Sequence, residues 1–391
     1  MYTIGIICEY NPLHLGHAKQ LAAVRRQFGP DCGVVCLMSG NFVQRGYPAI
    51  LDKSLRAQAA LCSGADLVLE LPVQVSLSSA EGFASGGVGI LAPFCDGLCF
   101  GAETADVDTL MAAAEALLSP AFPPALAAHL KNGISFPSAR QAALEDMGLS
   151  GSALRKPNDI LAIEYCKAIL SGGYKLTPLP LPRRGDYHAQ APDPAEPSAT
   201  SLRLRMEAGE PWLHLVPPQA AAILSRGTLH TRQDGERPML ARLRTMDDGA
   251  FEALPYGSEG LWRKLMRAAR QEATLEEILQ SVKSKRYTRS RLDRMVMCAF
   301  LGLSQTDLSA PAPYVRVLAL NRRGRAILNA ARATGTFLNA GQIPDSPYWH
   351  LERRVGELYG LFARDIPDPP AQEARRRVIY MDTDHTDKGV Y

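Results

Sequence analysis

Residues 1–185 alternate between short apolar runs and helical patterns of polar and apolar positions. Apolar, often β-branched runs bounded by Gly, Pro or Asp predict strands at 2–8, 33–38, 66–70 and 97–100. The segments between them repeat apolar residues at helical spacing and predict helices at 17–27, 52–62 and 79–91. Strands spaced about 30 residues apart suit a parallel sheet that is buried on both faces and has right-handed helical crossovers. The pattern predicts a doubly wound α/β domain, continued by a helical region at 110–170 and an extended stretch at 175–180.

In such a sheet, ligands bind beyond the carboxyl ends of the strands, where the strand order reverses. The loops that leave the predicted strand ends are 9–16, 39–50, 71–78 and 101–105, and they contain most of the unusual residues of this half. A functional site is expected there.

The second half of the chain has a different pattern of predicted elements. Residues 189–199, AQAPDPAEPSA, hold three prolines and predict a linker or loop. Beyond it the chain shows mostly amphipathic helical patterns, at 217–224, 239–245, 260–269, 275–281 and 289–303. The predicted organisation is therefore a nucleotide-type α/β domain at 1–188, a Pro-rich linker at 189–200 and a mostly helical domain at 201–391.

The charge is divided between these halves. The 391 residues have a formal net charge of +3, with Gly, Pro and charged fractions that exclude collagen-like and mostly disordered classes. Residues 1–200 hold 14 Lys+Arg against 18 Asp+Glu, whereas residues 201–391 hold 29 against 22. This division fits an acidic half that works on a small molecule and a basic half that meets a polyanion, although ordinary scatter of surface charge would also produce it. With no signal-peptide pattern and no apolar run of membrane length, we expect a cytoplasmic protein with no membrane partner.

The residues with the clearest chemistry follow the first predicted strand. His14, Gly16 and His17 open the first helix as His-x-Gly-His. Glycine lets the backbone approach a phosphate, a helix N-terminus offers unpaired N–H groups, and two imidazoles add donors at the same point. This arrangement suits a triphosphate, and it suits nucleotidyl transfer, in which fixed donors stabilise charge that builds on the phosphoryl oxygens.

Other interpretations of this segment have less support. Two histidines in a first helical turn could be simple polar caps, but Asn11-Pro12 forces a turn directly before them. Zinc binding lacks a third ligand nearby, so no metal site is predicted. The chain has neither the GxxxxGK[ST] phosphate loop nor a dinucleotide glycine pattern in the required place, which argues against P-loop NTPases and dehydrogenases.

Six strings in order extend the pattern: EYNPLHLGH (9–17), MSGNFVQRG (38–46), FGAE (100–103), KPNDILAIEY (156–165), SATSLR (198–203) and KRYTRSRL (285–292). Together they resemble the tRNA(Met) cytidine acetate ligase family of the HxGH nucleotidyltransferase superfamily. The resemblance runs from residue 1 to about residue 295. Leu13 and Leu15 replace the family's usual Phe and Asn, and FGAE replaces FGSE, which leaves both histidines and the glycines in place.

The resemblance implies an ATP-dependent ligase that joins acetate to AMP, releases pyrophosphate, and transfers the acetyl group to N4 of the wobble cytidine of elongator methionine tRNA. It implies that His14 and His17 are catalytic and that Mg²⁺ enters only with the ATP phosphates. It places ATP on Gly101, Asn158 and Arg183, with Arg184 a rival for Arg183. It also places ATP on one continuous segment: Ile7, Cys8, Glu9, Tyr10, Asn11, Pro12, Leu13, His14, Leu15, Gly16, His17, Ala18, Lys19 and Gln20.

The residue chemistry agrees in outline with this assignment. Gly101 ends the fourth predicted strand, where a side chain would collide with a ligand, unless it is only a turn residue. Asn158 follows Pro157 and reads as a helix N-cap, a role as plausible as ligand contact. Residues 39–45 leave the second strand and either line an acyl-substrate pocket or form a surface loop.

The second half holds a candidate RNA-binding segment. Residues 263–294 contain ten Lys/Arg and four acidic residues, with Tyr287 among the charges as a possible stacking ring. The predicted RNA contacts are Lys283, Lys285, Arg286, Arg289 and Arg291, although a basic run is often only a solvated helix face. Two other functions stay open: an adenylyltransferase for a small metabolite, and a non-catalytic RNA-binding module that senses a nucleotide.

Overall fold

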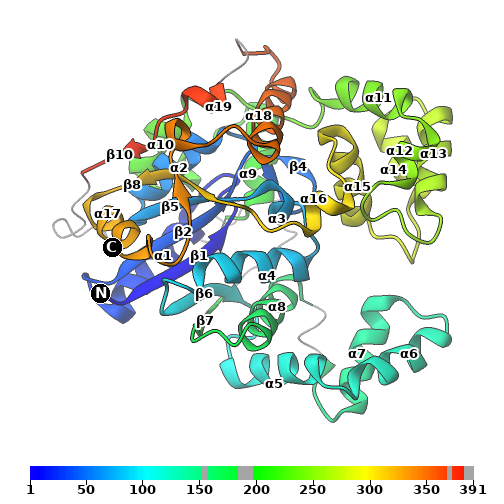
Figure 1. Ribbon diagram of the computed structural model, residues 1–391, viewed down its shortest axis with the longest axis horizontal. Helices are drawn as coiled ribbons and strands as arrows, with labels where there is room; N and C mark the ends of the chain where they lie inside the picture. Colours follow the sequence, from blue (N-terminus) through cyan, green and yellow to red (C-terminus); the bar gives the residue numbers. More distant parts are fainter. Residues whose placement is uncertain (152–155, 184–196, 368–371, 383–391) are drawn as a thin grey trace.

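The computed structural model describes residues 1–151, 156–183, 197–367 and 372–382. Within these residues, eight strands form one sheet in the order β10-β8-β5-β2-β1-β6-β7, with β9 paired to β8 (Figure 1). The strands of the first half are β1 (Thr3–Cys8), β2 (Gly33–Ser39), β5 (Leu67–Leu71), β6 (Gly97–Ala102) and β7 (Thr177–Pro182). These five run parallel to one another, so the predicted doubly wound sheet is confirmed.

Helices cover both faces of this sheet because each strand sends alternate apolar side chains to opposite sides. On β2, Val35 and Leu37 belong to the core beneath α4, α5 and α8, whereas Val34 and Cys36 belong to the core beneath α1, α2 and α9. The helices of this part are α1 (Leu15–Phe28), α2 (Lys53–Cys62), α3 (Val73–Ser76), α4 (Ala80–Leu91), α5 (Val107–Leu118), α6 (Phe122–Lys131), α7 (Phe136–Asp146), α8 (Pro157–Ser171), α9 (Ala199–Ala208) and α10 (Pro218–Leu224).

The predicted elements of the first half match these bounds closely. The predicted loop after β2 additionally contains a short antiparallel hairpin, β3 (Phe42–Val43) with β4 (Tyr47–Pro48). No single helix of the described chain is long and apolar enough to cross a membrane, although the bent pair α5 and α6, at 78° to each other, has sufficient combined length and apolar composition.

A helical lobe follows, with its own apolar core. Figure 1 shows it beside the sheet, at the upper right of the view. Its helices are α11 (Glu236–Thr245), α12 (Asp248–Glu252), α13 (Leu261–Gln271), α14 (Leu275–Val282) and α15 (Arg289–Leu301), followed by α16 (Gln305–Ser309). Phe42 and Leu77 from the first half belong to the same core, so the lobe is packed against the loops that leave β2 and β5.

The chain then returns to the sheet, which the sequence prediction missed. Strand β8 (Val315–Leu320) is buried and runs antiparallel to β5, and β9 (Phe337–Leu338) and β10 (Ile379–Tyr380) flank β8. The helices of this return are α17 (Arg322–Ala331), α18 (Pro347–Tyr359) and α19 (Gln372–Arg375). The predicted boundary at 189–200 therefore does not separate sheet from helices, because β8, β9 and β10 complete the edge of the sheet beside β5.

Candidate nucleotide and RNA site

The first helix begins at a pair of interlocked histidines. His14 has an extended backbone and is the N-cap of α1, and its Nδ1 accepts a hydrogen bond from the backbone N–H of Gly16 at 3.1 Å. The backbone N–H of His14 in turn donates to Nδ1 of His17 at 3.3 Å. The two rings stack with their centroids 3.7 Å apart. Because the two histidines are three residues apart, both rings accept backbone hydrogen bonds within the first turn of α1 and stack on each other.

These contacts determine which ring nitrogens carry protons. Because Nδ1 of each histidine accepts a hydrogen bond, a neutral imidazole must carry its proton on Nε2. The buried Nε2 of His14 has no hydrogen-bond partner among the described residues. An unpaired buried donor is costly in a protein and points to a ligand that would satisfy it.

The surroundings keep both rings uncharged. Burial, with smaller contributions from Arg183 and Arg203, lowers the pKa of His14 to about 3. Burial, followed by His14 and Arg183, also lowers the pKa of His17 well below the usual value. At neutral pH the site therefore holds two neutral N–H donors beside two guanidinium groups, which favours an anion.

A second helix begins at the same place. Ser198 caps α9 by accepting from the backbone N–H of Ser201 at 3.0 Å. A Cβ placed on Gly16 would lie 3.0 Å from Cε1 of His14, so a side chain at this position would press on that ring. The same Cβ would lie 4.0 Å from the carbonyl oxygen of Pro197, which shows that the start of α1 lies beside the start of α9. The positive ends of two helices thus point toward one region.

Arg203, in the first turns of α9, was not assigned a role from the sequence. Its Nη1 donates to the carbonyl oxygen of Asn11 at 2.7 Å, which attaches α9 to the loop before His14. Its position within SATSLR, shortly after a Ser cap, was the signal available in the sequence. The structure adds it to the candidate site.

The remaining predicted ATP-site residues meet at the end of β6. The nearest atom to a Cβ on Gly101 would be Cδ of Arg183, at 3.7 Å. Nη1 of Arg183 donates to Oδ1 of Asn158 at 3.4 Å, and Nδ2 of Asn158 donates to Oε1 of Glu103 at 2.7 Å. The structure therefore brings Gly101, Asn158 and Arg183 together, while Arg184 lies outside the described residues.

The prediction that Asn158 is a helix N-cap is wrong. Lys156 is the N-cap of α8, and Pro157 is its first residue. Proline suits this first position because its missing N–H would have no partner there. Asn158 consequently lies inside the first turn, and its side chain is held by Glu103 instead of capping the helix.

The loop after β2 is not a surface loop. Ser39, Asn41 and Phe42 are all buried. The fully buried guanidinium of Arg56 donates to the carbonyl oxygens of Glu9 at 2.7 Å and Ser39 at 3.1 Å, and it also bonds the carbonyl of Gly40. One side chain of α2 thereby ties together the loops that leave β1 and β2.

The same loop is joined to the helical lobe. The hydroxyl of Tyr47 donates to Oδ2 of Asp293 in α15 at 3.0 Å. Gly46 has a φ of +77°, and a Cβ there would lie 2.5 Å from the backbone of Asp293, so α15 packs directly on this turn. The lobe is thus positioned by a loop that also borders the histidine site.

Some of the predicted RNA-binding residues are exposed, and others are held in ion pairs or hydrogen bonds within the protein. Lys283, Lys285 and Arg286 are exposed, and Arg286 pairs with exposed Glu259. Arg289 instead pairs with Glu276 at 2.6 Å and with buried Asp293 at 3.1 Å. Arg291 donates to the carbonyl oxygen of Tyr256 at 2.8 Å.

Tyr287 is not available as a stacking ring, contrary to the prediction, because only 3% of it is exposed. It is buried in the core of the lobe, and Lys264 of α13 lies over its ring. The exposed basic surface instead combines Lys283, Lys285 and Arg286 with Arg263, Lys264 and Arg267 on the solvent side of α13.

The fold and this site define a nucleotidyltransferase of the HIGH class, whose family model, HIGH Nucleotidyl Transferase, matches residues 1–368. More narrowly, the chain belongs to the tRNA(Met) cytidine acetate ligase family. It is 36% identical to the protein of that name from Kosmotoga olearia, over 97% of this chain and 100% of the relative. It is 32% identical to the one from Anoxybacillus flavithermus, over 96% and 98%.

Solved structures agree with this membership. The apo structure of Thermotoga maritima TmcAL superposes with a TM-score of 0.89 at 27% identity, covering 98% of this chain and 100% of that one. A second structure of TmcAL, bound with alpha-thio ATP, superposes with a TM-score of 0.87 over the same shares. The family and this neighbour support ATP binding by the present fold.

Proposed function

We propose that this protein activates acetate with ATP as acetyl-adenylate, releases pyrophosphate, and transfers the acetyl group to N4 of the wobble cytidine of elongator methionine tRNA. The observation that carries the proposal is the convergence of two helix N-termini, two neutral histidines and two arginines around Gly16. The names of the relatives supply the substrates acetate and tRNA(Met).

In the first step, an acetate oxygen attacks the α-phosphorus of ATP and pyrophosphate leaves. Negative charge grows on the phosphoryl oxygens, and the Nε2–H groups of His14 and His17 donate to them from fixed positions. Arg183 and Arg203 bind the phosphates, and Mg²⁺ enters with the triphosphate. Donors held rigidly before the reaction lower its barrier without reorganising, which is where their catalytic benefit arises.

In the second step, the tRNA base attacks the acetyl carbonyl and AMP leaves. The exposed basic residues of α13 and of the segment before α15 contact RNA phosphates, which fixes the position of the tRNA on the lobe. The loop after β2 contacts α15 and the core of this lobe, so it joins the proposed RNA-binding lobe to the adenylating half. We place the reaction in the cytoplasm, where its tRNA substrate occurs.

Acetate-dependent exchange of labelled pyrophosphate into ATP, measured without RNA, tests the first step. The proposal expects exchange with acetate and none without it. An adenylyltransferase for a small metabolite would show no exchange with acetate, and a nucleotide-sensing RNA-binding module would show none with any acid. Either result would refute the proposed activity.

A further inference from the structure

The helical lobe touches the α/β half at the turn between β3 and β4. Gly46 is the last residue of this turn, where its N–H donates to the carbonyl oxygen of Val43 at 2.9 Å, and Tyr47 begins β4. Both residues contact Asp293 of α15, which is 246 positions after Tyr47 in the sequence. We call the three residues Gly46, Tyr47 and Asp293 the seam.

Gly46 allows one backbone to lie directly against another. Its φ of +77° is in the left-handed region, which residues with a side chain rarely adopt. A Cβ there would lie 2.5 Å from the carbonyl carbon of Asp293 and 2.6 Å from the backbone nitrogen of Arg294. Ordinary contact begins at 3.4 Å, and backbone atoms cannot rotate aside. A side chain at position 46 would therefore separate the turn from α15 by about 1 Å.

Asp293 is buried, and donors from three segments hold its carboxylate. The hydroxyl of Tyr47 donates to Oδ2 at 3.0 Å. Arg232, between α10 and α11, donates to Oδ1 at 2.8 Å, and Arg289, at the start of α15, donates to Oδ1 at 3.1 Å. The guanidinium of Arg232 also lies over the ring of Tyr47, 5.1 Å from its centroid. A buried carboxylate held in this way favours one arrangement of its partners, because losing a partner leaves a buried charge less well paired.

On its other side, the turn is attached to the loop that leads to the histidines. The backbone N–H of Gln44, in the same turn, donates to Oε1 of Glu9 at 2.9 Å. The next residue after Glu9 is Tyr10, and the centroid of its ring lies 4.9 Å from that of His17. A series of direct contacts and chain neighbours therefore runs from the seam to His17.

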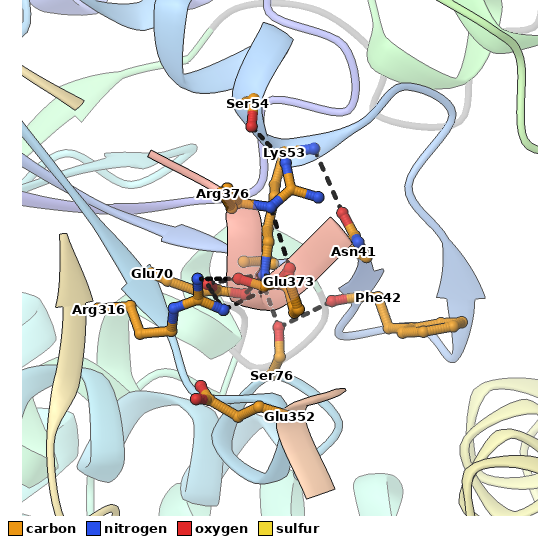
Figure 2. Close-up of polar contacts among 12 residues, drawn as sticks. Asn41, Phe42, Lys53, Ser54, Glu70, Ser76, Arg316, Glu352, Glu373 and Arg376 are labelled. Carbon is orange, nitrogen blue, oxygen red and sulfur yellow. Dashed lines mark hydrogen bonds and ion pairs between the residues drawn. The ribbon is translucent and has the colours of Figure 1, made fainter. Parts of the chain in front are cut away.

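The base of the β3–β4 hairpin is also held by the α/β half. The hydroxyl of Ser76 donates to the carbonyl oxygen of Phe42 at 3.0 Å, and the backbone N–H of Lys53 donates to Oδ1 of Asn41 at 3.2 Å (Figure 2). The side chain of Lys53 is in turn fixed by Glu70, at 2.6 and 2.9 Å. Because the hairpin is held at its base and at its turn, a displacement at the seam moves the lobe and not the hairpin.

The transfer step depends on how the lobe is placed, whereas the other activities do not. In the proposed function the acetyl-adenylate forms at the histidines of the α/β half, and the RNA phosphates lie on the lobe. Reacting atoms must come within about 3–3.5 Å of each other, and a misplacement of about 1 Å can cost about 100-fold in rate. Adenylate formation takes place within one half and RNA affinity arises on the other, so neither requires the two to be in register.

We propose that the seam is a positioning element for acetyl transfer: Gly46 and Tyr47, through Asp293, set the placement of the RNA-binding lobe on the adenylating half. This placement determines how closely the cytidine amine approaches the acetyl carbonyl. The inference rests on the proposed function and assigns the seam to only one of its two steps. The three are positioning residues, since each acts through the lobe and touches neither substrate.

Gly46→Ala tests the close approach of the two backbones. With acetyl-adenylate supplied and tRNA saturating, the single-turnover rate of acetyl transfer should fall by about 100-fold, while pyrophosphate exchange and the Kd for tRNA stay within about twofold of the wild type. Gly148→Ala is the matched control, because Gly148 has a φ of +79° and a Cβ there would meet no atom of the described chain within 4 Å. This control has the same backbone strain without the contact, so its transfer rate should be unchanged.

Tyr47→Phe tests the seam without changing the backbone. It removes the hydroxyl that donates to Asp293 and keeps the ring beneath Arg232. The saturating transfer rate should fall by about tenfold, the lower end of what a hydrogen bond to a charged group contributes. The KM for tRNA should stay unchanged, a separation of rate from affinity that a general loss of folding would not produce.

The outcomes separate the seam from its alternatives. Transfer at the wild-type rate in folded G46A would overturn the inference, and if G46A does not fold, the same result in Y47F would overturn it. An equal fall in pyrophosphate exchange or in tRNA affinity would also do so, since the seam would then act on a different step. An equal fall in G148A would assign the effect to backbone strain. Absence of exchange in the wild-type protein would instead refute the proposed function itself.

Discussion

Replacing His17 with alanine removes one of the two donors at the start of α1. In the structure, His17 carries its proton on Nε2 because Nδ1 accepts from the backbone of His14. Loss of one fixed donor to a developing oxyanion costs roughly 100- to 1,000-fold in rate, or about 2.7–4 kcal/mol. The variant should therefore retain about 1% or less of acetate-dependent pyrophosphate exchange.

The same change should affect folding much less. The backbone N–H of His14 loses its partner and the ring stack of 3.7 Å is removed, a loss comparable with that of a helix cap, about 0.5–2 kcal/mol. Urea unfolding measures this cost separately from activity. His214→Ala is the matched control, since that histidine is exposed.

The affinity for tRNA should stay near the wild-type value in His17→Ala, because the basic lobe is untouched. If a folded His17→Ala variant exchanged pyrophosphate at a rate within about threefold of the wild type, the assigned role would be refuted. A threefold change in rate corresponds to only about 0.6 kcal/mol of activation free energy, well below the effect expected for such a donor.

Three further changes test other parts of the structure. The pKa values of His14 and His17 are lowered in the folded protein, so on acidification these histidines gain protons in the unfolded chain first. The unfolding free energy should therefore fall between about pH 6.5 and 4, by up to about 1.4 kcal/mol per pH unit per histidine. Urea titrations at several pH values measure this fall. Glu373→Gln removes the buried carboxylate that Lys53, Arg316 and Arg376 share and leaves Glu70 as the remaining carboxylate beside Lys53 and Arg316. It should cost about 3–5 kcal/mol of stability, measured by the same method. The double change Lys285→Ala with Arg286→Ala should weaken tRNA binding and lower its salt slope by up to about 2, while sparing pyrophosphate exchange; a loss of both activities would contradict the division of labour.

The sequence predicted what depends on local spacing. The alternation of apolar strands and helices defined the parallel sheet, and His14, Gly16 and His17 lie within one helical turn, so their convergence follows from the motif itself. Gly101 and Asn158 were expected in one site only through family resemblance. Their contact through Arg183 depends on the pairing of β6 with β7, which residue spacing does not reveal.

Strand β8 shows why the rest was missed. Arg316 interrupts its apolar pattern, and a buried arginine is acceptable there only because Glu373 pairs with it from 57 residues away. The charged residues Lys53, Glu70 and Glu352 were missed for the same reason, since they come together from α2, β5 and α18. Tyr287 was wrongly predicted to be an exposed stacking ring because it lies among charged residues in the sequence. In the structure its ring is buried in the core of the lobe.

We propose that one chain both makes an acetyl-adenylate and delivers the acetyl group to a tRNA cytidine. The most direct measurement is mass spectrometry of nucleosides from elongator methionine tRNA that has been incubated with the purified protein, ATP and isotopically labelled acetate. We expect N4-acetylcytidine that carries the label, at the wobble position, only when ATP and acetate are both present. Unmodified cytidine in a reaction where the protein does exchange pyrophosphate with acetate would contradict it.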